Sequence, residues 1–377
     1  MKKLLLIISL LIPVFTYAQK KSKVPSTYDL LIGTYTKGSS KGIYVYRFYT
    51  ESGKLAYLSE IDDVSNPSYL CVSNNNKFIY AVNENKSGEV SAFTFDPVIG
   101  TMKFINKQSS AGDSPCYVSV DKDQKNVFVA NYGSGSMAVL PVNKDGSLNA
   151  PSQVIQDAGK GTNPQRQEGP HGHSAVLSND NKYLLFSDLG LDKVNVYRYK
   201  SSKPQPLIPA DPAFVSVTPG NGPRHTTFSA DGKYVYLLQE MGSMINVYNY
   251  DGGKLKQLQS ITMMQDGFKG TKGAAALHIS PDGKFLYASN RLDASGLVVY
   301  SIDPNDGQLT FVARYPSYGK NPRDFAIDPT GNFLVVANQD SDSIYIYRID
   351  KATGRLSITH NKLEIGNPVC VKFTAAQ

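Results

Sequence analysis

The sequence has few of the residues that build disulfide frameworks or metal centres, with three cysteines and five histidines among its 377 residues. The number of cysteines is odd, and Cys71, Cys116 and Cys370 form no Cys-x-x-Cys motif. Each of them lies in an apolar run typical of a strand. A disulfide framework needs paired cysteines, and a zinc site needs clustered cysteine or histidine ligands. We therefore expect three small apolar thiols, no disulfide framework, no metal and no other cofactor.

The sequence contexts of covalent catalysis and of nucleotide binding are also missing. The run Gly38–Gly42 matches Gly-x-Ser-x-Gly by letter, but it lies between two strand-like segments instead of at the turn from a strand to a helix, so it is not the nucleophile elbow of serine hydrolases. The run Gly133–Ser136 lies between two strand-like segments instead of between a strand and a helix, so it is not a dinucleotide-binding fingerprint. Asp303–Gly307 lacks the ligand spacing of a calcium loop and is typical of a hairpin turn.

The apolar run near the N-terminus is too short to cross a bilayer. Lys2 and Lys3 precede the run Leu4–Phe15, and Ala18 follows it closely. This order is typical of a signal peptide cleaved after Ala18, whereas a spanning helix needs roughly 20 apolar residues. We expect a signal peptide at 1–18, a short tail at 19–28, and a periplasmic or secreted protein without a membrane span.

Positive charge is not concentrated enough for a nucleic-acid partner. The net charge is +7, and removal of residues 1–18 takes away Lys2 and Lys3 and no acidic residue, which leaves +5. The remaining basic residues are dispersed along the chain. Such a balance favours small anionic ligands over nucleic acid.

What the sequence does have is a repeat. Six stretches share a turn, a short apolar strand, a polar turn and a second apolar strand, and they begin at Asn66, Ser114, Pro170, Gly222, Gly273 and Asn321. The residues that end their first strands are spaced by 48, 57, 51, 51 and 48 residues. A third alternating strand and a glycine-containing hairpin to a fourth strand follow. Four antiparallel strands about every 50 residues are typical of a β-propeller blade.

The two ends of the repeat predict how the ring closes. DLLIGTYT, GIYVYRF and LAYLSEI give three strands without a first one, and NPVCVKFT from Asn367 is a first strand without the other three. The last strand should therefore complete the N-terminal blade, which would remove both free sheet edges. We predict one all-β domain over 29–377, a seven-bladed propeller without a helix longer than a turn. Its proline-rich segment between Tyr199 and Pro219 should form an irregular fourth strand.

The repeat spacing also predicts which side chains meet at one mouth of the central channel. In antiparallel blades, the start of the first strand and the end of the second lie at the same end of the ring. The charged or histidine residues at these positions are Glu84, His173, Arg224, Glu240, Arg291 and Arg323. Because the first strands are innermost and crowded, a buried arginine or glutamate there needs a partner or a ligand.

Two interpretations of this cluster remain open from spacing alone. The arginines could form structural ion pairs with Glu240 or Glu84 that join the blades. Alternatively, they could bind carboxylate or phosphate oxygens and a developing oxyanion, while Glu240 or His173 accepts a proton from water. Cys116 has no histidine in its own repeat. Direct attack of water on an ester or lactone, or proton transfer in an anionic acid, therefore fits better than covalent catalysis.

Several of these segments together resemble the seven-bladed propeller lactonase family, which includes propeller-type 6-phosphogluconolactonases and fungal carboxy-muconate cyclases. The matching segments are IGTYTKGSSKGIYVY, EGPHGHS, NGPRH, SADGKYVYLLQE and HISPDGKFLYASNR. The resemblance extends from about Asp29 to Thr374. It implies a metal-independent site whose catalytic residues are His173, Arg224, Glu240 and Arg291, with Arg323 competing for the role of Arg291.

The resemblance implies hydrolysis of a small anionic sugar lactone such as 6-phosphogluconolactone. In this hypothesis Glu240, with His173, activates water, while the arginines hold the acid group and the oxyanion. The further residues expected to contact the substrate are His171, Arg323, Glu84 and His225. The predicted export conflicts with a cytosolic sugar phosphate, so another sugar lactone or a lactone of aromatic catabolism is an alternative substrate. The alternative functions are a non-catalytic binding propeller and a muconate lactone-forming isomerase, because propellers host unrelated functions.

Overall fold

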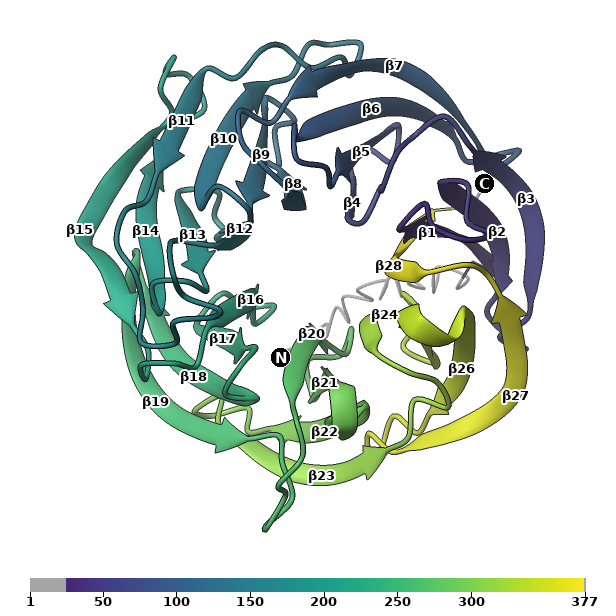
Figure 1. The fold of residues 1–377 in the computed structure, drawn as a ribbon. Coiled ribbons are helices and arrows are strands. Elements are labelled where there is room, and N and C mark those ends of the chain that lie inside the picture. The colour runs from purple at the N-terminus through teal and green to yellow at the C-terminus, as the bar shows by residue number, and fades with distance from the viewer. Residues whose placement is uncertain (1–24, 376–377) are drawn as a thin grey trace, which may run out of the picture.

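The computed structural model describes residues 25–375 and arranges them as seven four-stranded antiparallel sheets around a central channel (Figure 1). This arrangement confirms the predicted all-β, seven-bladed propeller. The predicted signal peptide at 1–18 and residues 19–24 of the predicted tail lie outside the described residues. In the part of the chain that the structure describes, no helix is both long and apolar enough to cross a membrane.

We number the blades in the order of the six repeats, with the closing blade as the seventh, and give the strands of each from the channel outward. Blade 1 contains β4 (Leu70–Val72), β5 (Phe78–Asn83), β6 (Glu89–Asp96) and β7 (Thr101–Ser109), and blade 2 contains β8 (Pro115–Val120), β9 (Asn126–Asn131), β10 (Ser136–Pro141) and β11 (Gln153–Gln156). Blade 3 contains β12 (Gly172–Leu177), β13 (Tyr183–Asp188), β14 (Lys193–Tyr199) and β15 (Leu207–Ser216), and blade 4 contains β16 (Pro223–Phe228), β17 (Tyr234–Gln239), β18 (Met244–Asp251) and β19 (Lys254–Thr262).

The remaining three blades follow the same order. Blade 5 contains β20 (Gly273–Ile279), β21 (Phe285–Arg291), β22 (Gly296–Ile302) and β23 (Leu309–Tyr315), and blade 6 contains β24 (Pro322–Ile327), β25 (Phe333–Asn338), β26 (Ser343–Ile349) and β27 (Leu356–Glu364). Blade 7 contains β28 (Pro368–Ala375), β1 (Thr27–Thr34), β2 (Ile43–Tyr49) and β3 (Leu55–Ile61). The helices within residues 25–375 are two 3-10 turns, η1 (Leu292–Ala294) and η2 (Gln339–Ser341).

Blade 7 closes the ring as the sequence predicted. The C-terminal strand β28 is innermost and pairs antiparallel with β1, from Tyr28 opposite Ala375 to Thr34 opposite Pro368. In Figure 1 the purple N-terminal strands and the yellow C-terminal strand lie in one blade. The proline-rich segment forms β15 of blade 3, where Asn195 pairs with Phe214 and Tyr197 with Pro209, so residues 210–213 lie opposite the single residue Val196.

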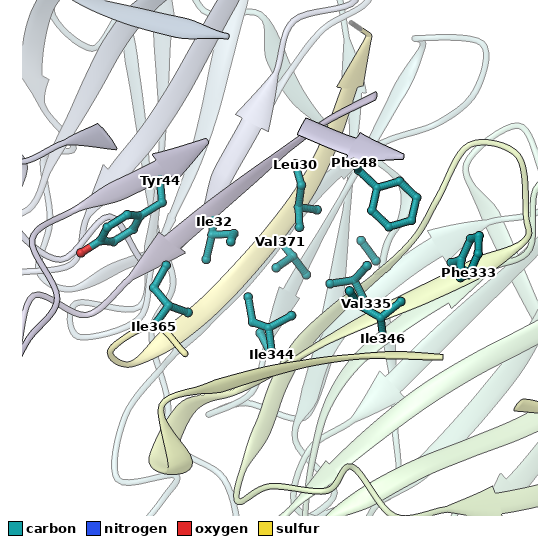
Figure 2. Packing of buried hydrophobic residues seen from close by; sticks show 12 residues of the cluster. Leu30, Ile32, Tyr44, Phe48, Phe333, Val335, Ile344, Ile346, Ile365 and Val371 are labelled. Carbon is teal, nitrogen blue, oxygen red and sulfur yellow. The ribbon is translucent and has the colours of Figure 1, made fainter. Parts of the chain in front are cut away.

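Seven clusters of buried hydrophobic residues form the core, one between each pair of neighbouring blades. Figure 2 shows the cluster between blades 6 and 7, where Leu30, Ile32 and Val371 of blade 7 pack against Val335 and Ile344 of blade 6. Full burial of such a side chain contributes roughly 1.5–3 kcal/mol. The closing interface is therefore held by the same packing as the other six.

The outer hairpin turns reach across to the preceding blade. Gly307, in the turn between β22 and β23, has a φ of 71°, and a Cβ there would lie 2.5 Å from the ring of Tyr234 in blade 4. Its carbonyl accepts a hydrogen bond of 2.9 Å from the hydroxyl of Tyr236. Glycine is therefore required at this turn both by the left-handed backbone and by the close contact between blades.

Asp324 of β24 joins blade 6 to the closing strand. Its Oδ2 accepts the N–H of Val371 at 3.1 Å and lies 3.5 Å from Nζ of Lys372, both on β28. Its Oδ1 lies 3.3 Å from Nε2 of His278 in blade 5. Burial alone would raise the pKa of Asp324, but Lys372 and His278 lower this pKa from 3.8 to about 2. The ionised carboxylate thus stabilises the closure of the ring.

We expect Asp324→Asn to lower the free energy of unfolding by about 2–4 kcal/mol, because the amide leaves Lys372 without its carboxylate. Since the pKa of Asp324 is lower in the folded protein than its ordinary value, its stabilising contribution is present above about pH 4 and is lost as the pH falls toward about 2. Urea unfolding at neutral pH and thermal melts at decreasing pH measure these effects, with Asp266→Asn at an exposed position as the control. Equal stability of Asp324→Asn and the unchanged protein would contradict this role.

Candidate active site

One residue near the start of several innermost strands is left out of the strand pairing and faces the channel mouth. In blade 4, Pro223 pairs with Gln239 and His225 pairs with Leu238, so that Arg224 is the extra residue. The same register shift recurs in blades 2, 3 and 6, where the extra residues are Cys116, His173 and Arg323. Such a bulge re-aims a side chain and is common beside functional sites.

A left-handed residue precedes this bulge in several blades and explains the recurring Asn-Pro and Gly-Pro pairs. Gly222 and Asn321, before the bulges of blades 4 and 6, have φ values of 66° and 55°, and Asn66 has a φ of 45° at the corresponding position of blade 1. Asparagine and glycine adopt this conformation at lower cost than other residues. The sequence motif at the start of the innermost strand is thus a backbone requirement of the turn that presents the channel-facing side chain.

Glu240, directly after β17, is the centre of the site. Its Oε2 accepts a hydrogen bond of 3.0 Å from Nε of Arg224 and lies 3.0 Å from Nη2 of Arg291. Its Oε1 accepts a hydrogen bond of 2.7 Å from Nη2 of Arg166. Nε2 of His173 lies 3.8 Å from Oε2. The structure therefore brings together four of the six residues predicted from spacing, the same four that the resemblance implies, and adds a fifth, Arg166.

Burial and charge set the protonation states of these groups. Burial would raise the pKa of Glu240, but Arg291 and Arg224 hold it well below its ordinary range. Burial, reinforced by Arg224, lowers the pKa of His173 well below 6.5 despite the opposing effect of Glu240. Burial, together with Arg291, also lowers the pKa of Arg224 to about 10. At neutral pH the site consequently holds a carboxylate, a neutral imidazole and charged arginines.

Arg323 and Glu84 form a second, looser group at the same mouth. Nη2 of Arg323 lies 4.0 Å from Oε2 of Glu84, and its guanidinium lies 5.5 Å from the ring centre of Tyr35. The hydroxyl of Tyr35 donates to Glu84 at 3.0 Å, and the hydroxyl of Ser68 donates to it as well. Arg291, rather than Arg323, contacts Glu240 directly. The two arginines thus have different carboxylate partners.

The structure places His171 and His225 away from the pocket surface. His171 stacks on Tyr132 at 4.5 Å, donates through Nδ1 to the carbonyl of that tyrosine at 2.9 Å, and lies 3.3 Å from Glu168. His225 lies deeper in the channel, with Nε2 3.2 Å from Nη1 of Arg224. Neither histidine is among the residues that line the pocket described next. Buried His173 and Arg224 do not line it either, but they contact Glu240, which does.

A pocket of about 440 Å³ lies at this mouth of the channel. Its acidic side chain is Glu240, and the basic side chains that line it are Arg166, Lys272, Arg291 and Arg323. When buried Arg224 and nearby Glu84 are included, the site has five basic groups and two carboxylates. The pocket therefore has an excess of positive charge suited to an anionic ligand.

Tyr35, Arg166 and Lys272 are among the pocket residues that sequence reasoning missed. Tyr35 follows β1 as Glu240 follows β17, so it occupies the corresponding position of the blade that closes the ring. Arg166 lies in the insertion that lengthens one repeat step to 57 residues. Lys272 directly precedes β20. Ring closure and the longer step were signals for the first two, whereas no periodic signal marks Lys272.

The thiol of Cys116 lies next to the site but is not set up as a nucleophile. Its Sγ is 3.7 Å from Nδ1 of His173, which comes from the neighbouring blade and not from its own repeat. Burial, together with Glu84, raises the pKa of Cys116, so the thiol stays protonated at neutral pH. Within residues 25–375, no group of three or more His, Cys, Asp or Glu side chains is arranged to hold a metal ion.

Comparisons with known proteins agree on one family. A family model described as "Lactonase, 7-bladed beta-propeller" matches residues 29–373. A 6-phosphogluconolactonase of Bacillus subtilis (strain 168) is 36% identical over 345 residues, which are 91% of this chain and 97% of that protein. A solved periplasmic gluconolactonase of Pseudomonas aeruginosa is 42% identical with a TM-score of 0.90, over 93% of this chain and 100% of that chain.

Replacing Glu240 tests the charge balance of the site. We expect Glu240→Gln to lower the free energy of unfolding by about 3 kcal/mol, because Arg224 and Arg291 lose a buried counter-charge. Phosphate should raise the melting temperature of this variant more than that of the unchanged protein, since the anion can bind the arginines that have lost a counter-charge. Thermal melts in phosphate and in sodium chloride at equal ionic strength separate site binding from screening. Equal shifts in both salts would refute anion binding at these arginines.

Proposed function

The chain belongs to the seven-bladed β-propeller lactonase family, and on that premise we propose that it hydrolyses a small anionic lactone with water activated at Glu240. The observation that carries this proposal is the grouping of Glu240 and Arg291, which line a basic pocket, with buried Arg224 and His173, which contact Glu240. Similarity to proteins named 6-phosphogluconolactonase and gluconolactonase supports a sugar lactone as the substrate class.

In the proposed reaction, Arg291 and Arg224 donate to the carbonyl oxygen of the lactone and stabilise the oxyanion that forms there. Glu240, with His173 beside it, takes a proton from water as the water oxygen bonds to the carbonyl carbon. The bond from that carbon to the ring oxygen then breaks, and the proton passes to the ring oxygen. The product is the open-chain hydroxy acid. The raised pKa of Cys116 supports water rather than this thiol as the nucleophile.

The alternative of a non-catalytic binding propeller has some support in the ion pairs of Glu240, since paired charges are a common structural device. Two observations favour the enzyme over it. The pocket is open and retains more basic than acidic groups after these pairs are formed. Neutral His173 also lies beside the carboxylate, where a purely structural ion pair has no need of it.

We further propose that the protein acts outside the cytoplasm. The predicted signal peptide at 1–18 supports this location, as does the similarity to a gluconolactonase named as periplasmic. An unphosphorylated or carboxylated lactone would then be more available than a sugar phosphate. The substrate panel for testing must include each of these kinds.

Turnover of a lactone panel by residues 19–377 tests the proposal directly. The panel contains glucono- and galactonolactone, 6-phosphogluconolactone and muconolactone. We expect one of them to be hydrolysed faster than in buffer, and Glu240→Gln to lower kcat by at least about 100-fold. Circular dichroism must show that the variant is folded, and product analysis separates hydrolysis from isomerisation. Full activity of folded Glu240→Gln on the best substrate would exclude the proposed base.

The pH profile gives an independent test. Because the pKa of Glu240 and that of His173 are both far below their ordinary values, Glu240 stays ionised and His173 stays neutral as the pH falls to about 6. We therefore expect kcat/KM to be nearly constant from about pH 8 to about pH 6, after subtraction of spontaneous hydrolysis. A loss of activity with a midpoint near 6.5 would show instead that a histidine with an ordinary pKa must be neutral.

A further inference from the structure

Arg166 differs from the other arginines that contact Glu240. It comes from the loop between β11 and β12, and its side chain is 45% exposed, whereas the side chains of Arg224 and Arg291 are 2% and 17% exposed. Its Nη2 donates to Oε1 of Glu240 at 2.7 Å and to the hydroxyl of Tyr132 at 3.2 Å. Arg166 thus covers one oxygen of the carboxylate from the open side of the pocket.

The loop beneath this side chain is anchored independently of it. Gln167 is fully buried, and its Oε1 accepts the N–H groups of Thr162 and Asn163 at 3.1 and 3.0 Å. Its Nε2 donates to the carbonyl of Leu189 at 2.9 Å. The backbone at Arg166 is therefore fixed by its neighbour, and the guanidinium can change partners without movement of the loop.

The contact with Arg166 opposes the chemistry proposed for Glu240. A carboxylate oxygen that accepts a charge-assisted hydrogen bond is a weaker proton acceptor for water. The other oxygen is already engaged by Arg224 and Arg291. The planar guanidinium of Arg166 can bind a carboxylate or a phosphate with the same two-point geometry. An acidic group on a bound ligand would therefore compete with Glu240 for Arg166.

We propose that Arg166 is a specificity-determining residue. When a lactone substrate with a second acidic group, carboxylate or phosphate, binds, Arg166 leaves Glu240 and pairs with that group. Oε1 of Glu240 is then free to accept the proton of water. The inference rests on the proposed lactone hydrolysis. It predicts that the acidic group increases kcat as well as lowering KM, because the exchange takes place only when that group is bound. A neutral lactone leaves Arg166 on Glu240.

The test compares three lactones of one sugar that carry a hydroxyl, a carboxylate or a phosphate at carbon 6: gluconolactone, glucarolactone and 6-phosphogluconolactone. We expect the unchanged protein to prefer at least one acidic lactone, and Arg166→Gln to reduce that preference in kcat by roughly tenfold or more. On gluconolactone, kcat of this variant should rise, because Oε1 of Glu240 is then free without an acidic group on the substrate. The pH at which activity falls on the acidic side should also rise, since Glu240 has lost a cation.

Lys160→Gln is the matched control, because it removes a positive charge from an exposed position of the same loop. It should leave all three rates unchanged, and Arg166→Lys should retain part of the preference. An equal loss on neutral and acidic lactones in Arg166→Gln would overturn the exchange and leave Arg166 a structural partner of Glu240. An unchanged preference would overturn it as well.

The failure of the proposed function gives a different result from the failure of the exchange. If the unchanged protein hydrolyses none of the three lactones, the proposed hydrolysis is wrong. Calorimetric binding of 6-phosphogluconate and gluconate then tests Arg166 alone. A loss of affinity confined to 6-phosphogluconate in Arg166→Gln would support the capture of the acidic group, and equal losses for the two acids would refute it.

Discussion

The pairing of β28 with β1 is the constraint on which the rest of the molecule depends. This pairing places the first and the last described strands in one blade. The ring therefore has seven interfaces of the same kind between neighbouring blades, each with its own buried cluster. Seven innermost strands must then share a narrow channel, and their bulged residues converge at one mouth. Asp324 reinforces this geometry, because its carboxylate bonds the closing strand from the blade next to it. The site is thus a consequence of closure, since its groups come from different blades.

Charge within the mouth follows from the same crowding. A buried arginine such as Arg224 needs a carboxylate, and a buried carboxylate such as Glu240 needs several donors, so each stabilises the other. The balance is not neutral, because Arg291, Arg323 and other basic groups outnumber the carboxylates. In a scaffold that used these charges only for stability, the excess of basic over acidic groups would have no stabilising role. An anion in the pocket would relieve the repulsion among the arginines.

The fold and the centre of the site could be predicted because both are periodic. Fixed offsets from the end of the first strand in each repeat predict His173, Arg224, Glu240 and Arg291 at one end of the ring. The structure explains this spacing, because a bulge at the same place in several blades turns the extra residue of the innermost strand toward the channel. Spacing cannot tell which side of a bulge a neighbour faces. His225, which was expected to contact the substrate, lies against Arg224 and does not line the pocket.

What the sequence could not provide lies where periodicity ends. Tyr35 belongs to the pocket only because the last strand pairs with the first, so its position in the series becomes visible after closure. The long repeat step before blade 3 showed that a loop was inserted, but not that Gln167 would bury itself and hold the loop over the mouth. Non-repeating segments such as this loop can differ between proteins of one fold, and such differences can change the bound ligand without changing the ring.

The expected export and the basic pocket impose different demands on the substrate, and the chemistry of arginine reconciles them. Sugar phosphates are cytosolic, which argues against phosphate outside the cell, yet Arg166, Arg291 and Lys272 favour an anion. A planar guanidinium binds a carboxylate with the same two-point geometry as a phosphate. A lactone with a free carboxylate would therefore satisfy the pocket and the location together. Because one relative is named for a phosphorylated lactone and another for an unphosphorylated one, the proposed second acidic group need not be a phosphate.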